Sequence, residues 1–220
     1  MRNFRTEGII VKRRNLGEAD RIITAVTPQY GKIHIKAGGV RKITSKRSAH
    51  IELLNSSILS LYKGSGMFVL TEVKMIQDFQ ELKNDFNKIG IAYHFCELVD
   101  SLCPENQENY TVFSLLKKTL MQLAQIEVVH VQTQVGNGFD EYTLGTFGIS
   151  MHDAPVEQYR SISKHASYHD LVQTFEIELL TALGYWDKSV AVSKDLDTQT
   201  MIESIIERRL RARSVFTKLR

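Results

Sequence analysis

Short apolar runs separated by turn residues fill the first eighty residues of the chain, a pattern typical of β-strands. Five runs are predicted as strands, at residues 6–12, 20–27, 32–37, 52–62 and 67–75. In the third run apolar residues alternate with Lys32 and Lys36, so both lysines are expected to face outward. Five short strands with turns of this kind favour a small closed barrel over an open sheet.

Beyond residue 78 the apolar positions recur at steps of three and four, which is typical of helices. We expect one helix from about residue 82 that ends at Pro104, and a second that begins after an N-cap at Asn109. Two more are expected at 168–183, stopped by Gly184, and at 198–211. The fold class is therefore α+β, with an N-terminal five-stranded barrel in 1–79 and a mainly α-helical domain in 80–220.

One segment interrupts the helical rhythm. Between 126 and 150, valine and threonine alternate with polar residues up to Gly136, and residues 136–138, Gly-Asn-Gly, are a strong turn signal. Residues 139–147 then supply a return strand. The pattern predicts a β-hairpin inserted in the helical domain.

Composition adds an uneven charge. The chain has 220 residues, 43% hydrophobic and 24% charged, as in ordinary globular proteins. Residues 1–50 hold twelve Lys and Arg against three acids, a net +9, whereas 81–200 are net −9 and 201–220 are net +4. The basic N-terminal part indicates a polyanionic partner. Nucleic acid is the favoured one, and an anionic membrane surface is the alternative.

The densest basic segment is the polar loop of residues 40–50. Arg41, Lys42, Lys46 and Arg47 fall within seven residues, interleaved with hydroxyl side chains, and phosphate oxygens bind such donors. The other interpretation of a basic loop is a solvated charged surface. Three arginines from a neighbouring turn are expected to join the loop in a barrel: Arg13, Arg14 and Arg21.

Other candidate nucleic-acid contacts are less specific. A second arginine cluster lies near the C-terminus, at Arg208, Arg209, Arg211 and Arg213. It is either a second phosphate site or a set of cations that complements a helix C-terminus. The aromatic residues of the N-terminal part (Phe4, Tyr30, Tyr62 and Phe68) are expected in the core rather than on a stacking platform.

The sequence carries no recognisable catalytic or metal-binding pattern. It has no nucleophile elbow, no phosphate-binding Gly-Lys-Ser/Thr loop and no set of metal ligands, so we expect neither an enzyme nor a bound cofactor or metal. Cys96 and Cys103 are seven residues apart, about 10 Å along a helix, too far for a disulfide and expected to be buried thiols. With no secretion signal and no apolar span, the expected location is the cytoplasm, with no membrane partner.

Several segments resemble the RecO family of DNA repair proteins. The likeness is carried by residues 6–14 (Thr-Glu-Gly-Ile-Ile-Val-Lys-Arg-Arg), 17–21, 27–32 and 36–42, and it continues through 50–79; 175–185 and 205–216 add patchier matches. The resemblance implies an N-terminal OB-fold, a helical C-terminal domain, and binding of single- and double-stranded DNA with annealing of complementary strands. It also implies a bacterial protein that, with RecR, helps to place RecA on strands coated by single-strand binding protein.

By this likeness the DNA-binding residues are the basic positions Arg13, Arg14, Arg21, Lys36, Arg41, Lys42, Lys46 and Arg47. Two departures concern the C-terminal half. Many family members carry a four-cysteine zinc motif after the segment that matches 175–185, but residues 186–197 contain no cysteine, so no zinc is expected. The segment from 126 to 165 is longer than the family pattern and is interpreted as an insertion. The alternative function is an interaction module whose barrel binds an acidic peptide, such as the tail of single-strand binding protein, without binding DNA.

Overall fold

A computed structural model describes residues 3–64, 66–126, 130–135, 138–143, 168–186, 198–207 and 210. For the segments 130–135 and 138–143 it describes the backbone alone. In this part of the chain no helix is both long enough and apolar enough to cross a bilayer.

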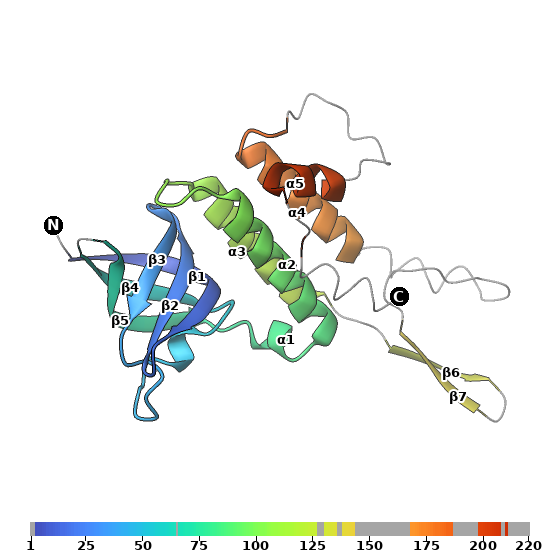
Figure 1. The fold of residues 1–220 in the computed structure, drawn as a ribbon. Coiled ribbons are helices and arrows are strands. Elements are labelled where there is room, and N and C mark those ends of the chain that lie inside the picture. Colours follow the sequence, from blue (N-terminus) through green and yellow to red (C-terminus); the bar gives the residue numbers. More distant parts are fainter. Residues whose placement is uncertain are drawn as a thin grey trace.

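A closed barrel forms the N-terminal part of the structure (Figure 1). Its strands are β1 (Asn3–Leu16), β2 (Asp20–Thr27), β3 (Gly31–Ala37), β4 (Ser56–Lys63) and β5 (Phe68–Gln77). They are joined in the order β1-β2-β3-β5-β4, and β4 pairs back onto β1 to close the barrel. All neighbours are antiparallel except β3 and β5. This is a five-stranded Greek-key barrel, so the predicted OB-fold is confirmed.

Three details of the barrel differ from the prediction. Strand β1 is twice as long as expected, because it begins at Asn3 and continues beyond a bulge between Ile10 and Lys12 as far as Leu16. Strand β4 begins four residues late, because Ala49–Ile51 form a short 3-10 helix and Leu54 takes a positive φ of 71°. Lys32 leaves the barrel interior as expected, but it is buried, since its ammonium donates to the Asp100 carbonyl oxygen of a helix.

Five helices follow the barrel in the described residues (Figure 1). They are α1 (Gln80–Lys83), α2 (Phe86–Leu102), α3 (Tyr110–Gln125), α4 (Tyr168–Ala182) and α5 (Thr198–Ile206). The first predicted helix is two helices, because the Asp85 carboxylate caps a new start and accepts from the N–H groups of Asn87 and Lys88. Asn109 caps α3 as predicted, accepting from Val112 N–H at 3.0 Å.

The interrupting segment forms the predicted hairpin. Strands β6 (His130–Val135) and β7 (Gly138–Thr143) pair antiparallel, from His130 opposite Thr143 to Val135 opposite Gly138. The predicted helix over 198–211 ends earlier among the described residues, at Ile206, and Glu207 takes a positive φ of 53°.

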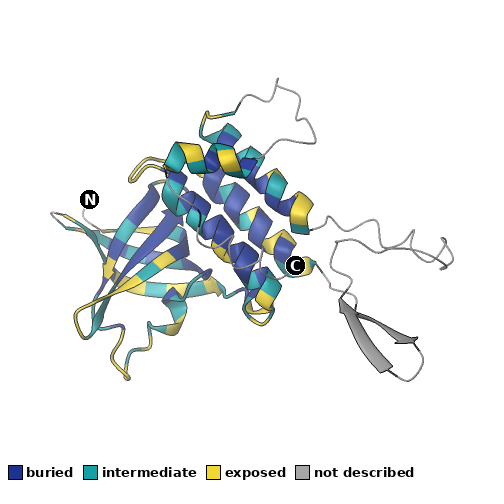
Figure 2. Ribbon diagram, turned by 45° about the vertical axis from the view of Figure 1, so that its right-hand side comes forward, coloured by how far each residue is buried: buried dark blue, intermediate teal, exposed yellow. Residues whose placement is uncertain are grey.

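Two apolar clusters hold these elements together. One fills the barrel and includes Ile23, Ile35 and Leu59. The other joins α2, α3, α4 and α5 to the outer wall of the barrel, through residues such as Ile9 and Val26. Figure 2 shows this buried seam between barrel and helices in dark blue. The helices therefore cover one side of the barrel and leave the far end of its strands open to solvent.

Candidate nucleic-acid interface

The predicted site residues gather at the end of the barrel where β1 turns into β2. The register places Arg14 opposite Ile22 and Ile22 opposite Lys36, so the two cations lie in one row across three strands. The loop that follows β3 folds back onto this turn: the Arg41 N–H donates to the Ala19 carbonyl oxygen at 2.9 Å. Figure 1 shows this loop, in blue, projecting below the barrel.

We call this surface the basic end of the barrel. It comprises the eight residues expected to bind DNA: Arg13, Arg14, Arg21, Lys36, Arg41, Lys42, Lys46 and Arg47. They come from the end of β1, the start of β2, the end of β3 and the loop after it.

Three cations of the basic end are fully available to a ligand. The side chains of Arg14, Lys42 and Lys46 are exposed and form no hydrogen bond or ion pair with another described residue, although the charge of Lys42 helps to lower the pKa of Asp20. Figure 2 shows much of the surrounding loop as exposed. These side chains can meet phosphate oxygens without breaking a contact inside the protein.

Two of the other cations share a single acid. Glu52, which follows the short 3-10 helix, pairs with Arg13 through one carboxylate oxygen and with Arg21 through the other, at 3.3 Å. The pair of guanidinium groups exceeds the charge of the one carboxylate, so this arrangement keeps a net positive charge while fixing both arginines in place. Glu52 is absent from the sequence-based site, because it lies 39 and 31 positions from its partners.

Arg47 and Arg41 hold the loop in shape. The Arg47 guanidinium donates to the Gly38 carbonyl oxygen at 2.7 Å and to the Leu70 carbonyl oxygen at 3.2 Å. The Arg41 guanidinium donates to the Gly17 carbonyl oxygen at 2.7 Å. Backbone carbonyls leave the cationic charge uncompensated, so both arginines still add to the positive potential, although their positions are set by the loop.

Asp20 organises the same loop from β2. Its carboxylate accepts from the Gly39 N–H at 2.8 Å and lies 3.4 Å from the Lys36 ammonium. The hydrogen bond from Gly39, helped by Lys36, lowers the pKa of Asp20 below its ordinary value of 3.8. The ionised Asp20 carboxylate thus fixes the backbone at the start of the loop through its hydrogen bond with Gly39, which takes a positive φ of 68°. The sequence feature that could have indicated this role is the position of Asp20, an acid within the strongly basic residues 1–50.

Within the described ranges no three His, Cys, Asp or Glu side chains gather in a way that would hold a metal ion. The expected buried thiols are confirmed: Cys96 and Cys103 are free and buried. Burial raises the pKa of Cys96 to about 12 and that of Cys103 to about 11, so both stay protonated near neutral pH. The predicted C-terminal cluster, Arg208, Arg209, Arg211 and Arg213, lies outside the described residues.

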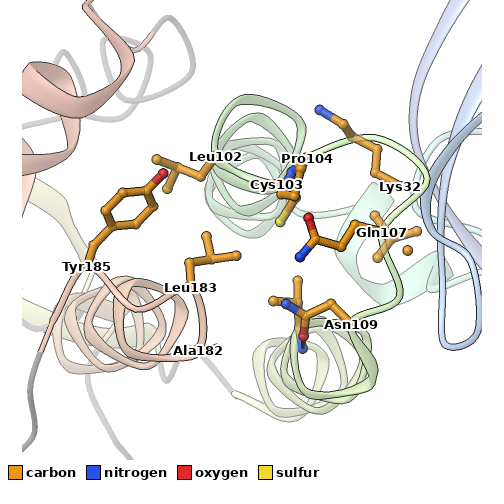
Figure 3. Close-up of a pocket in the computed structure, with 12 residues that line it drawn as sticks. Lys32, Leu102, Cys103, Pro104, Gln107, Asn109, Ala182, Leu183 and Tyr185 are labelled. Atoms are coloured by element: carbon orange, nitrogen blue, oxygen red, sulfur yellow. Dashed lines mark hydrogen bonds between the residues drawn. The ribbon is translucent and has the colours of Figure 1, made fainter.

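A cavity of about 250 Å³ lies elsewhere, between the β2–β3 turn, the α2–α3 connection and the end of α4. Figure 3 shows Leu183 and Tyr185 on one side of it and Lys32 and Gln107 on the other. None of the eight residues of the basic end lines this cavity.

The chain is similar in sequence to one family of known proteins. Residues 1–79 match the family described as recombination protein O N terminal, and residues 83–135 match recombination protein O C terminal. The chain is 41% identical over 122 residues to a DNA repair protein RecO of a Roseiflexus species, covering 56% of this chain and 43% of the relative. It is 32% identical over 148 residues to a RecO protein of Acetivibrio thermocellus, covering 67% and 58%.

A RecO protein from Dehalococcoides mccartyi is 40% identical over 121 residues, which is 55% of this chain and 48% of the relative. The chain thus spans about half the length of the curated relatives that it matches. The two family matches together cover the barrel, α2, α3 and the strand β6, and most of α1 lies between them.

Proposed function

Because the chain belongs to the recombination protein O family, a family of DNA repair proteins, we propose that it binds DNA and acts as a mediator of repair and recombination. In this proposal residues 1–79 are the nucleic-acid-binding domain and residues 80–220 are the helical domain. The observation that carries the proposal is the basic end of the barrel, where the side chains of Arg14, Lys42 and Lys46 are exposed and make no hydrogen bond or ion pair with another described residue.

Phosphate contacts of this kind suit both single strands and duplexes. Lysine and arginine side chains neutralise phosphates without reading the base sequence, so they supply affinity for any DNA. Annealing two strands requires that the repulsion between two polyanions is reduced while the bases stay free to pair. A cationic surface that touches only the backbone meets both requirements, and no covalent chemistry is needed.

The partners follow from the family in the same proposal. They are RecR, RecA and single-strand binding protein, with the chain helping the recombinase to reach coated single strands. An exposed cationic loop is also suited to an acidic peptide, such as the tail of single-strand binding protein. An interaction module of that kind would bind the peptide and not DNA.

The experiment compares fluorescence anisotropy of labelled single-stranded and duplex oligonucleotides for three proteins: wild type, a Lys42→Glu/Lys46→Glu variant and a Lys118→Glu control. Lys118 is exposed on α3, away from the basic end. The proposal expects binding of both DNA forms by wild type and the control, and a large loss in the double variant that is similar for every sequence. A double variant that loses an acidic peptide but keeps DNA affinity would establish the interaction module instead.

Strand annealing is measured on the same proteins, as the rate at which two complementary labelled strands form a duplex. The double variant is expected to anneal more slowly in proportion to its lost DNA affinity. An annealing rate that stays at the wild-type value despite lost binding would contradict the proposed link between the two.

A further inference from the structure

Three aromatic rings cluster at the mouth of the barrel where β1 begins, β2 ends and β5 begins. The rings of Phe4 and Tyr30 have centroids 4.3 Å apart, and Phe68 stands edge-on to Phe4 at 5.5 Å. All three pack against the barrel core, as their sequence pattern predicts, yet each remains partly exposed. We call these residues the aromatic mouth.

A cavity of about 300 Å³ opens beside these rings. Tyr30 and Phe68 line it together with Met67 and two polar groups, Lys63 from the end of β4 and Asn106 from the α2–α3 connection. Ligand pockets in proteins measure roughly 300–1,000 Å³ and occur in the mouths of β-barrels. A cavity at the lower limit of that range suits a group of the size of a single planar ring system.

The walls of the cavity are fixed before any ligand arrives. The Tyr30 N–H donates to the Thr27 hydroxyl at 3.2 Å, which in turn donates to the Gly31 carbonyl oxygen at 3.1 Å. On the opposite wall, the Asn106 N–H donates to the Lys32 carbonyl oxygen at 2.8 Å.

Gly31 and Gln107, which follow the lining residues Tyr30 and Asn106 in sequence, show how closely these two segments meet. Gly31 takes a φ of 60°, and a Cβ atom there would lie 1.7 Å from the Gln107 carbonyl oxygen. Only glycine allows the β2–β3 turn and the α2–α3 connection to approach this closely. The cavity is therefore preorganised, which reduces the entropy that a ligand must lose on binding.

The lining offers the three interactions that a nucleotide needs. Aromatic rings stack on the face of a base, and stacking tolerates any base because each has a π face. The Asn106 amide can donate and accept hydrogen bonds at a base edge, and the Lys63 ammonium is a partner for phosphate. Bases inside a duplex are stacked and paired, so they cannot enter. The lining chemistry thus matches an unpaired nucleotide.

The mouth is also connected to the basic end. Arg47, in the loop of the basic end, donates to the carbonyl oxygen of Leu70, which lies two residues after Phe68 on β5. Two residues of a strand span about 7 Å. This contact holds the loop against the same stretch of β5 that carries Phe68.

We propose that the aromatic mouth, with Lys63 and Asn106, binds an unpaired base of single-stranded nucleic acid and distinguishes single strands from duplexes. This inference rests on the proposed DNA-binding function and adds a base-binding site to the phosphate contacts of the basic end. The basic end holds either form of DNA, and the mouth adds affinity only where bases are free.

The test uses two labelled single-stranded probes of equal length and charge, an oligothymidine and a fully abasic strand, so that only the bases differ. The measured quantity is the ratio of the two dissociation constants, Kd for the abasic strand over Kd for oligothymidine. Stacking of one base on an aromatic ring gives a wild-type ratio of at least about five.

Two variants remove the base contacts in different ways. Tyr30→Leu removes a stacking ring but keeps an apolar plug in the barrel. Asn106→Gly removes the amide from an exposed connection whose φ of 56° glycine accepts without strain. The matched control is Tyr62→Leu, since Tyr62 is a partly exposed aromatic residue of β4 that does not line the cavity. Thermal unfolding confirms that each variant is folded.

The expected result is a ratio that falls towards one in Tyr30→Leu, falls in Asn106→Gly, and stays at the wild-type value in Tyr62→Leu. The Lys42→Glu/Lys46→Glu variant is expected to bind both probes more weakly with its ratio retained. A wild-type ratio near one, or a ratio unchanged in both mouth variants, overturns the base-binding site while leaving the phosphate-binding function intact. Absence of any binding by wild type would instead remove the proposed function and this site with it.

Discussion

Replacing Arg47 by methionine should cost stability, whereas the same change at its neighbour Lys46 should cost DNA affinity. Both residues belong to the same basic loop and both were expected to bind DNA. The structure separates them, because Arg47 donates to the carbonyl oxygens of Gly38 and Leu70, and Lys46 makes no such contact with a described residue.

The magnitude follows from these hydrogen bonds. A hydrogen bond to a charged group contributes roughly 1.5–3 kcal/mol net. Arg47 makes a good bond to Gly38 at 2.7 Å and a longer one to Leu70 at 3.2 Å, and it is partly exposed. Water can replace part of each bond, so we expect a loss of about 2 kcal/mol on Arg47→Met. For a chain of this length, that loss lowers Tm by about 4–8 °C.

The assay is urea unfolding followed by circular dichroism, together with anisotropy binding to a single-stranded oligonucleotide. Lys46→Met is expected to unfold within about 0.5 kcal/mol of wild type, as exposed substitutions usually do, but to bind DNA more weakly. The reasoning is refuted if Arg47→Met matches wild type in stability, or if Lys46→Met is the less stable of the two.

Three further predictions concern Glu52 and Asp20, the two acids that contact the basic end, and the two buried cysteine thiols. Glu52→Gln should raise DNA affinity and steepen its salt dependence, because it releases two guanidinium groups; a weaker complex would contradict this. The lowered pKa of Asp20 stabilises the fold above about pH 4, and that contribution is lost as the pH falls through the lowered value. Asp20→Asn should therefore flatten the acid limb of a stability profile. Cys96 and Cys103 should react with a thiol reagent at pH 8 only on unfolding; rapid labelling of the folded protein would show that they are accessible.

Local patterns were sufficient for the elements of the fold. The period of two in β3, the turn residues between strands and the cap at Asn109 are properties of neighbouring residues, so the sequence shows them directly. The break before α2 was missed, because Leu82 of α1 is buried in the same cluster as α2 and continues its apolar spacing. Asp85 carried the signal for the new start, as an N-cap residue directly before Phe86.

Local sequence patterns could not predict which basic residues are available to a ligand and which are held by contacts inside the protein. Whether an arginine is available depends on partners that the fold brings close, and Glu52 lies far in sequence from the arginines that it pairs with. Lys32 shows the same limit. The alternation in β3 correctly predicts that its side chain points out of the barrel, but α2 packs over it and buries it, and this packing depends on the tertiary structure. Charge density thus located the surface, and the structure distinguished the residues that shape it from those that face solvent.

The measurement that tests the central claim most directly is the salt dependence of single-strand binding. The slope of log Kd against log salt concentration reports the phosphates neutralised, at about 0.7 per contact for a single strand. Three available cations, Arg14, Lys42 and Lys46, predict a slope of at least about 2 for wild type. Lys42→Gln/Lys46→Gln should lower it by about 1.4, and Lys118→Gln should leave it unchanged. A flat wild-type slope, or a slope that the double variant does not change, would contradict the account.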